Sequence, residues 1–287
     1  MEKTFNIANI KIRVNTNFDF AITDRYSGFI YEGEDYDINY DFMLINDFIK
    51  LNMKPIFESV EYKIYEDNEK IYREFYNGSE VNACLIISKK DTTNYKCYVY
   101  PVYTKYKLSA MHLFDLMALE YAMMRKDTFI LHSSFICENN KAILFSASSQ
   151  TGKSTQASLW NKYKQSKIIN GDRSFLNKIN GKWVAHGSPY AGSSKIYVNE
   201  SYELGCIILL KQAKQNKVYI QSIKEKYKFL LKEITINYWD IDFYNKIIDL
   251  LIDLLNSVDI YTLQCLPNEG AVDVLAEKLK EGDYEKL

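Results

Sequence analysis

The first part of the chain alternates apolar and polar residues in short runs. Between residues 5 and 107 these runs include IKIRVNTNFDF, VEYKIYED, KIYREFY, ACLIIS and YKCYVYPVY, and Asn, Gly, Asp and Ser separate them. A period of two is typical of half-buried strands, and the separating residues are typical of turns. One short helix is expected around FMLINDFIKL. The pattern predicts a strand-rich N-terminal region over residues 1–107.

The pattern changes at Leu108, where apolar residues recur at three- and four-residue spacing through LSAMHLFDLMALEYAMMRK. This spacing predicts a helix, and Ser109 is its candidate cap. Strands are expected in TFILHSSFIC, NKAILFSAS, KIINGD, ELGCIILLK and IYTLQC, with a hairpin in SFLNKINGKWVAHG that turns at Asn180 and Gly181. Helices are expected over KSTQASLWNKYKQ, most of residues 222–256, and NEGAVDVLAEKLKE. The mixture predicts an α+β (mixed α/β) fold, with a domain boundary near residue 107 and a second domain over residues 108–287.

Charge and cysteine content narrow the class of protein. The 36 Lys and Arg residues nearly balance the 37 Asp and Glu residues, so we expect neither a nucleic acid nor a membrane surface as partner. The five cysteines are odd in number and form no CxxC pair, which predicts reduced thiols rather than disulfides or a zinc site. No apolar run reaches the length of a membrane span. We therefore expect a soluble, cytoplasmic protein.

The stretch SASSQTGKSTQ carries the candidate chemistry. It follows the expected strand AILF and precedes an expected helix, which is the strand, loop and helix arrangement of a phosphate-binding loop. Loop residues Ala147, Ser148, Ser149, Gln150, Thr151 and Gly152 would present backbone N–H groups to phosphates. Lys153 would reach the β- and γ-phosphates, and the Ser154 hydroxyl would bind Mg²⁺. The spacing predicts a nucleotide site.

Ala147 stands where such loops normally open with glycine. Alanine is the smallest replacement, and it is tolerable if φ is negative at that position. Gly152, by contrast, leaves room for the close approach of backbone to phosphate. A tripeptide Gly-Lys-Ser on its own also arises by chance, so the prediction depends on the flanking strand and helix.

Asp172 ends the short strand KIING, and one helix and one return strand separate it from Lys153. This spacing brings Asp172 back beside the loop, where it could bind the metal or accept a proton from an attacking hydroxyl. The alternative is that Asn170-Gly171-Asp172 is a simple turn. His132 ends the strand TFIL, so it could lie at the mouth of the loop, although a histidine at a strand end often has only a structural role.

The resemblance to a known family is carried by the region LHSSFICENNKAILFSASSQTGKSTQASLWNKYKQSKIINGDRSFL. This region resembles the HPr kinase/phosphorylase and phosphoenolpyruvate carboxykinase-like P-loop family, and the resemblance extends over about residues 108–281. A histidine at a strand end, a strand pair, the loop, a helix and an Asp-containing strand end follow in the family's order. The segment HGSPYAGSSKIYVNESYELGCIILLKQAKQNKV is similar to the family's smaller kinase-like members. The resemblance implies a P-loop core with mixed, partly antiparallel strands. It also implies that Lys153 binds phosphate, that Ser154 and Thr155 contact Mg²⁺ and phosphate, and that His132 assists near the transferred group.

The chain departs from the family at the acidic position, where two successive Asp are usual and this sequence reads Gly171-Asp172-Arg173. One of the two roles, base or metal ligand, must be lost, relocated or shared. We expect Asp172 near the metal and the acceptor hydroxyl, with His132 as a candidate second base. Arg173 and Lys195 are candidates to neutralise phosphate charge, and a surface salt bridge is the alternative for each.

The resemblance implies a kinase that uses ATP and Mg²⁺ to phosphorylate a hydroxyl, of the serine type, on a peptide or small molecule. Ribosomal-peptide tailoring is one setting for family members of this size, with residues 1–107 recognising the substrate; a homo-oligomer is an open expectation. The alternative function is a non-catalytic nucleotide-binding regulatory or scaffold protein for a partner enzyme, which Ala147 and the missing second Asp motivate.

Overall fold

The structure, a computed structural model, describes residues 1–105 and 107–284. The chain forms two compact units. The first contains Met1–Lys126 and Asn237–Ile241, and the second contains Asp127–Ile236 and Asp242–Leu287. The expected boundary at residue 107 thus differs from the division between the units. The segment expected to be a helix after Leu108 packs within the first unit.

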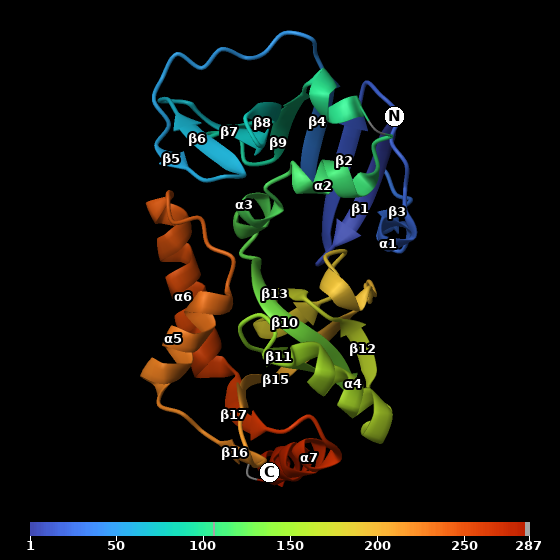
Figure 1. Ribbon diagram of the computed structural model, residues 1–287, viewed down its shortest axis with the longest axis vertical. Coiled ribbons are helices and arrows are strands. Elements are labelled where there is room, and N and C mark those ends of the chain that lie inside the picture. The colour runs from blue at the N-terminus through green and yellow to red at the C-terminus, as the bar shows by residue number, and fades with distance from the viewer. Residues whose placement is uncertain (106, 285–287) are drawn as a thin grey trace. The chain divides into compact units, whose positions relative to one another are not determined.

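The strands of the first unit form one mixed sheet in the order β3-β1-β2-β4-β9-β8-β7-β6-β5 (Figure 1). Their bounds are β1 Glu2–Ile7, β2 Ile10–Thr16, β3 Ile30–Tyr31, β4 Ile38–Leu44, β5 Phe57–Glu58, β6 Tyr62–Glu66, β7 Lys70–Asn77, β8 Glu80–Ser88 and β9 Asn94–Val99. Strand β4 pairs in parallel with both β2 and β9, and the other pairs are antiparallel. The runs quoted from the sequence coincide with β2, β6, β7, β8 and β9, so the alternation of apolar and polar residues predicted these five strands correctly.

Short helices accompany this sheet: α1 Asp24–Ser27, the 3-10 helix η1 Pro101–Lys105, α2 Ala110–Asp115 and α3 Leu119–Met124. Phe114 of α2 lies edge-on to Phe5, and the Tyr40 hydroxyl donates to the Met117 carbonyl, so α2 and the turn after it cover the central strands. Two sequence expectations are wrong here. The residues FMLINDFIKL continue β4 into irregular chain, and the helix after Leu108 is broken by Ala118, whose φ is +47°.

The second unit is built around a second mixed sheet, in the order β11-β10-β13-β14-β15-β17-β16, with β12 paired to β10. The bounds are β10 Phe129–Glu138, β11 Lys141–Ser146, β12 Lys167–Asn170, β13 Arg173–Ile179, β14 Lys182–His186, β15 Ser201–Gln212, β16 Lys217–Tyr219 and β17 Asp259–Cys265. Strand β15 pairs antiparallel with β14 and in parallel with β11 and β17. The carboxyl ends of β11 and β15 therefore lie side by side.

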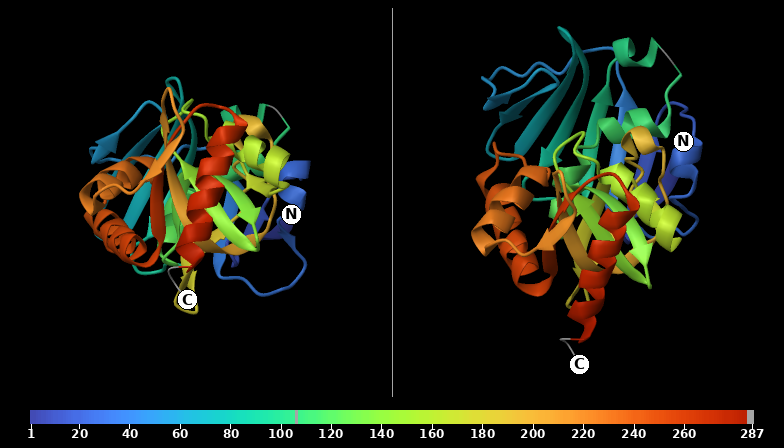
Figure 2. Two further views of the ribbon diagram at one scale, coloured as in Figure 1. Left: turned by 90° about the horizontal axis from the view of Figure 1, so that it is seen from below. Right: turned by 60° about the horizontal axis from the view of Figure 1, so that its bottom comes forward.

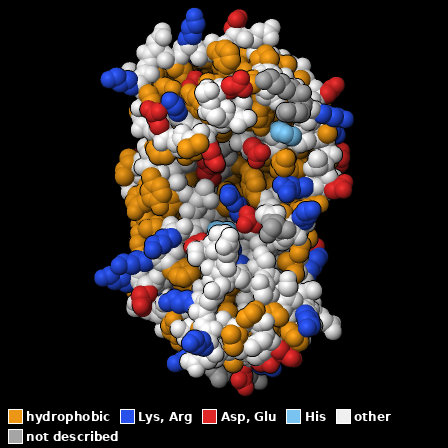
Figure 3. All heavy atoms as spheres, in the orientation of Figure 1, with side chains coloured by type: hydrophobic (Ala, Val, Ile, Leu, Met, Phe, Trp, Pro, Cys, Tyr) orange, Lys and Arg blue, Asp and Glu red, His pale blue; other side chains and the backbone are white. Residues whose placement is uncertain are grey.

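The helices of this unit are α4 Lys153–Lys164, η2 Gly192–Ser194, α5 Ile223–Glu233, α6 Ile241–Ser257 and α7 Glu269–Tyr284. Helices α4 and α7 pack against each other and share a core with the parallel strands (Figure 2). Phe145, Trp160 and Leu263 are buried in it, and burial of each such side chain contributes about 1.5–3 kcal/mol. On the surface, lysine side chains gather over α5 (Figure 3).

The α+β fold class is confirmed, because both units combine mixed sheets with helices. The type of P-loop core stays a prediction. No helix in the described part of the chain is both long enough and apolar enough to cross a membrane.

Candidate functional site

The candidate loop connects β11 to α4 and has the backbone of a tight turn. Gln150 and Gly152 have φ values of +64° and +115°, and L residues rarely adopt the second value. Ala147 is fully buried and does not have a positive φ. The condition for alanine at the opening position is therefore met. Ser148, Ser149 and Gln150 are exposed.

Lys153 begins α4 and turns back over the loop. Its ammonium donates to the carbonyl oxygen of Ala147 at 2.8 Å and lies 3.4 Å from that of Ser148. Burial lowers the pKa of Lys153, while the negative charges of Glu233 and Asp172 act in the opposite direction. A buried cation is thus held at the loop with two carboxylates nearby.

Asp172 occupies the turn between β12 and β13, beside the first turn of α4. The Ser154 hydroxyl, at the start of this helix, donates to the carbonyl of Gly171 at 3.2 Å. Gly192 lies on the other side of Asp172, where a Cβ would come within 2.9 Å of the Asp172 Cβ and Cγ. The sequence thus brings Lys153, Ser154 and Asp172 together as expected from their spacing.

Asn170 holds this turn in place from inside the protein. It is fully buried, and its Oδ1 accepts from the backbone N–H groups of Asp172 and Arg173 at 2.8 and 2.9 Å. Its amide nitrogen donates to the carbonyls of Ser188 and Tyr190 at 2.8 and 3.1 Å. One side chain therefore joins the acidic turn to the Gly187-Ser188-Pro189-Tyr190 segment. In the sequence, Asn170 is marked only as a polar residue at the end of a strand.

His132 lies between two carboxylates. Pairing of β10 with β13 aligns His132 with Arg173, and the His132 Nε2 lies 3.5 Å from the Asp172 Oδ1. On the other side, the His132 Nδ1 lies 3.0 Å from the Glu233 Oε2. Hydrogen bonds to Asp172 and then to Glu233 raise the pKa of His132. The hydrogen bond from His132 in turn lowers the pKa of Asp172, and the charges of Arg173 and Lys153 add to this effect.

Serines fix the backbone around this group. The Ser133 N–H donates to the Asp172 carbonyl at 3.0 Å, and the Ser134 hydroxyl donates to the Gly171 carbonyl at 3.0 Å. The Ser146 hydroxyl, at the end of β11, donates to the His132 carbonyl at 3.0 Å. All three serines are fully buried. They tie the strand ends that carry His132, the loop and Asp172 to one another.

Glu233 is a second residue of the site that the sequence does not single out. It is the last residue of α5, and no motif marks it. Of the two candidate phosphate-binding cations, Arg173 lies 3.5 Å from the Asp172 Oδ2 and keeps an exposed side chain. Lys195 is exposed at the end of η2, and no ion pair links it to the other site residues within the described chain.

Two side chains beside the loop carry oxygen atoms of the kind that Mg²⁺ prefers. Mg²⁺ is usually bound by one or two carboxylates together with water and substrate phosphates, and the Ser154 hydroxyl and the Asp172 carboxylate flank Gly171. Within the described residues no cluster of three or more His, Cys, Asp or Glu side chains could hold a metal alone. Ser154 and Asp172 are therefore suited to a metal that arrives with a nucleotide.

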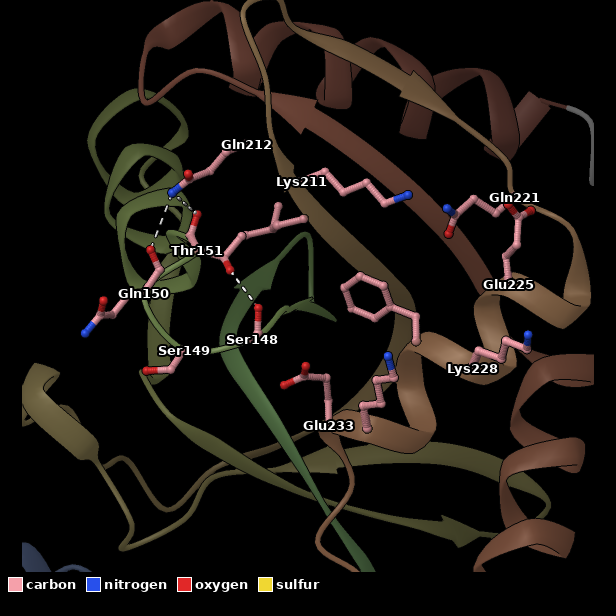
Figure 4. A pocket seen from close by; sticks show the side chains of 13 residues that line it. Ser148, Ser149, Gln150, Thr151, Lys211, Gln212, Gln221, Glu225, Lys228 and Glu233 are labelled. Carbon is pink, nitrogen blue, oxygen red and sulfur yellow. Dashed lines mark hydrogen bonds between the residues drawn. The ribbon is translucent and has the colours of Figure 1, made fainter.

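A pocket of about 780 Å³ opens beside the loop (Figure 4). Its walls are the loop residues 148–151, the end of β15 and one face of α5. Glu233 lines it at the end nearest Ser148 and Ser149, whereas Gln221 and Glu225 lie at the far end (Figure 4). Its volume is within the range of small-molecule sites.

No family model matches the chain, and no curated protein matches it. Among solved structures, 33 chains match. One is the Hpr(Ser) kinase/phosphatase from Coxiella burnetii, with 12% sequence identity and a TM-score of 0.31, over 55% of this chain and 96% of that chain. The likeness is remote.

Proposed function

We propose that this protein is a kinase that transfers the γ-phosphoryl group of ATP, with Mg²⁺, to a hydroxyl of a peptide or small molecule. The observation that carries the proposal is the contact of His132 with both Asp172 and Glu233, next to Lys153 at the loop. A protein that only binds a nucleotide needs a carboxylate there at most as a ligand of the metal that accompanies the phosphates. A phosphotransferase needs one to receive the proton of the acceptor.

Each residue has a role in the proposed reaction. The backbone N–H groups of residues 147–152 and the Lys153 ammonium bind the phosphates, and Ser154 and Asp172 would hold the metal, which neutralises phosphate charge. The hydroxyl oxygen of the acceptor forms a bond to the γ-phosphorus while the bond to the bridging oxygen of ADP breaks. Asp172 takes the hydroxyl proton, and His132 orients Asp172. Most of the rate enhancement would come from positioning and charge neutralisation.

Nucleotide-dependent thermal stabilisation tests the binding step. We would compare the wild type with Lys153→Ala and Asp172→Asn, in ATP, GTP and ADP, with and without Mg²⁺. A ligand that binds only the native state stabilises it by about 2.7 kcal/mol at a hundredfold excess over its dissociation constant. We expect ATP with Mg²⁺ to raise the melting temperature of the wild type and Lys153→Ala to lose the effect, while Asp172→Asn still binds ATP.

The chemical step is tested by release of ADP in the presence of candidate acceptors. Asp172→Asn should bind ATP and fail to transfer phosphate. If the wild type binds ATP but the Asp172→Asn variant turns it over equally fast, the kinase proposal is wrong and the non-catalytic nucleotide-binding alternative replaces it. If no nucleotide stabilises the wild type, both nucleotide-based functions fail.

A further inference from the structure

The pocket beside the loop is more cationic than a nucleotide site alone explains. Lys211 comes from the end of β15, and Lys228 and Lys232 come from successive turns of α5. None of these three forms an ion pair with a carboxylate in the described part of the chain. The gathering of lysines over α5 is visible on the surface (Figure 3).

The two acidic side chains of the pocket are already engaged. Glu225 accepts from the backbone N–H of Ser222 at 3.0 Å and from its hydroxyl at 2.6 Å, as part of the helix cap. Glu233 contacts His132. The three ammonium groups outnumber the two carboxylates of the pocket and form no ion pair with them, although the charge of Lys211 acts on Glu225. A ligand that matches the three lysines carries more than one negative charge.

The pocket contacts the phosphate-binding loop but not the start of the helix that follows it. Residues 148–151 line it, but Lys153, Ser154 and Thr155, which begin the helix beneath a bound nucleotide, do not. Glu233 connects it to the His132 and Asp172 pair. A molecule in this pocket would therefore lie next to the terminal phosphate and the proton acceptor, as an acceptor substrate must.

We propose that the acceptor of this kinase is a hydroxyl compound that carries two or more negative charges, bound along α5 by Lys211, Lys228 and Lys232. This inference rests on the proposed function, because it names the substrate class of the same site. The hydroxyl lies toward Asp172 and attacks the γ-phosphorus, its proton passes to the carboxylate, and ADP leaves. The acidic groups of the acceptor lie along the lysines. An acidic peptide with a serine and a free hydroxy acid share this chemistry.

Isothermal titration tests the pocket with ADP and Mg²⁺ present, so that the loop is filled. The probes are a serine peptide flanked by Asp and Glu, the same peptide with Asn and Gln instead, and citrate as a free hydroxy acid. The test variant is Lys228→Gln/Lys232→Gln. The matched control is Lys214→Gln/Lys224→Gln, which removes the same net charge from exposed lysines that do not line the pocket.

We expect the acidic peptide or citrate to bind, and the neutral peptide to bind at least tenfold more weakly. The pocket variant should lose roughly tenfold in affinity, the effect of two partly screened charge pairs, and the control variant should not. Binding of the acidic peptide indicates a peptide acceptor, and binding of citrate indicates a small-molecule acceptor. Equal binding of acidic and neutral peptides, no binding of either acidic probe, or an equal loss in the control would overturn the inference.

The outcomes separate this inference from the proposed function. If ATP with Mg²⁺ stabilises the wild type but acidic probes do not bind, the kinase proposal stands and the anionic acceptor is wrong. If acidic probes bind through the lysines while no nucleotide stabilises the protein, the anion pocket stands and the kinase proposal is wrong.

Discussion

Replacement of Asn170 by alanine tests how the acidic turn is held. The change removes four hydrogen bonds, two to the backbone N–H groups of Asp172 and Arg173 and two to the carbonyls of Ser188 and Tyr190. All four partner groups are backbone atoms around a side chain that is fully buried. Each such bond contributes about 0.5–1.5 kcal/mol net, so we expect the free energy of unfolding to fall by roughly 4 kcal/mol.

Urea unfolding, followed by tryptophan fluorescence, measures this loss. Asn245→Ala on α6 is the matched control, because Asn245 is exposed within a helix and alanine has the higher helix propensity. Its free energy of unfolding should stay within about 0.5 kcal/mol of the wild type. A loss below about 1 kcal/mol for Asn170→Ala would refute the reasoning, since the four bonds would then be replaced by water.

The variant Asn170→Asp tests the two hydrogen bonds that the Asn170 amide donates. The variant keeps the acceptor for the Asp172 and Arg173 N–H groups but turns a second carboxylate oxygen toward two carbonyl oxygens. Burial and this repulsion should raise the pKa of the new carboxyl in the folded state. The folded protein would then bind more protons than the unfolded chain, so stability should fall as the pH rises above about 4. A pH-independent difference from the wild type would contradict this account.

Three further predictions concern single side chains. Burial lowers the pKa of His186 to about 4. The free energy of unfolding is therefore highest above the unfolded pKa of about 6.5 and falls as the pH drops from there toward 4, by about 2 kcal/mol at pH 5. Urea unfolding at pH 5 and above pH 7 should show a smaller difference between the two pH values for His186→Gln than for the wild type. Gly192→Ala, at a φ of +52°, should cost roughly 1 kcal/mol of stability in the same assay and lower phosphate transfer more than ATP binding, because the new Cβ meets Asp172. Glu233→Gln should leave ATP stabilisation intact and slow ADP release in the presence of acceptor. The control under the same conditions is Lys224→Gln, an exposed lysine of α5 outside the pocket.

Local patterns predicted most of the secondary structure, because strand alternation, turns and caps are encoded over a few residues. The Asn180-Gly181 turn is an example, with φ values of +51° and +79°. The helix after Leu108 failed because apolar spacing does not reveal a residue in the left-handed region, here Ala118. The run FMLINDFIKL failed because β4 pairs on both sides, and buried strands and helices share such apolar runs.

The residues of the candidate site likewise fall into those that the sequence predicts and those that it does not. Lys153, Ser154 and Asp172 were predictable because one helix and one strand separate them, so the chain itself limits how far apart they can lie. Asn170 was hidden because its partners at Ser188 and Tyr190 depend on a loop that follows a complete hairpin. Glu233 was hidden because α5 reaches the site only through tertiary packing against β10. Residues contributed by distant elements leave no local pattern.

The position of Glu233 bears on the acidic residue that the sequence lacks after Asp172. Position 173 pairs directly with His132 across β10 and β13, so its side chain lies on the same face of the sheet as that of His132. Here Arg173 occupies that position and lies against Asp172, while the second carboxylate reaches the opposite ring nitrogen from α5. Because both His132 nitrogens face oxygen, the ring has one favoured orientation. A second carboxylate is therefore present at the candidate site despite its absence from the local motif.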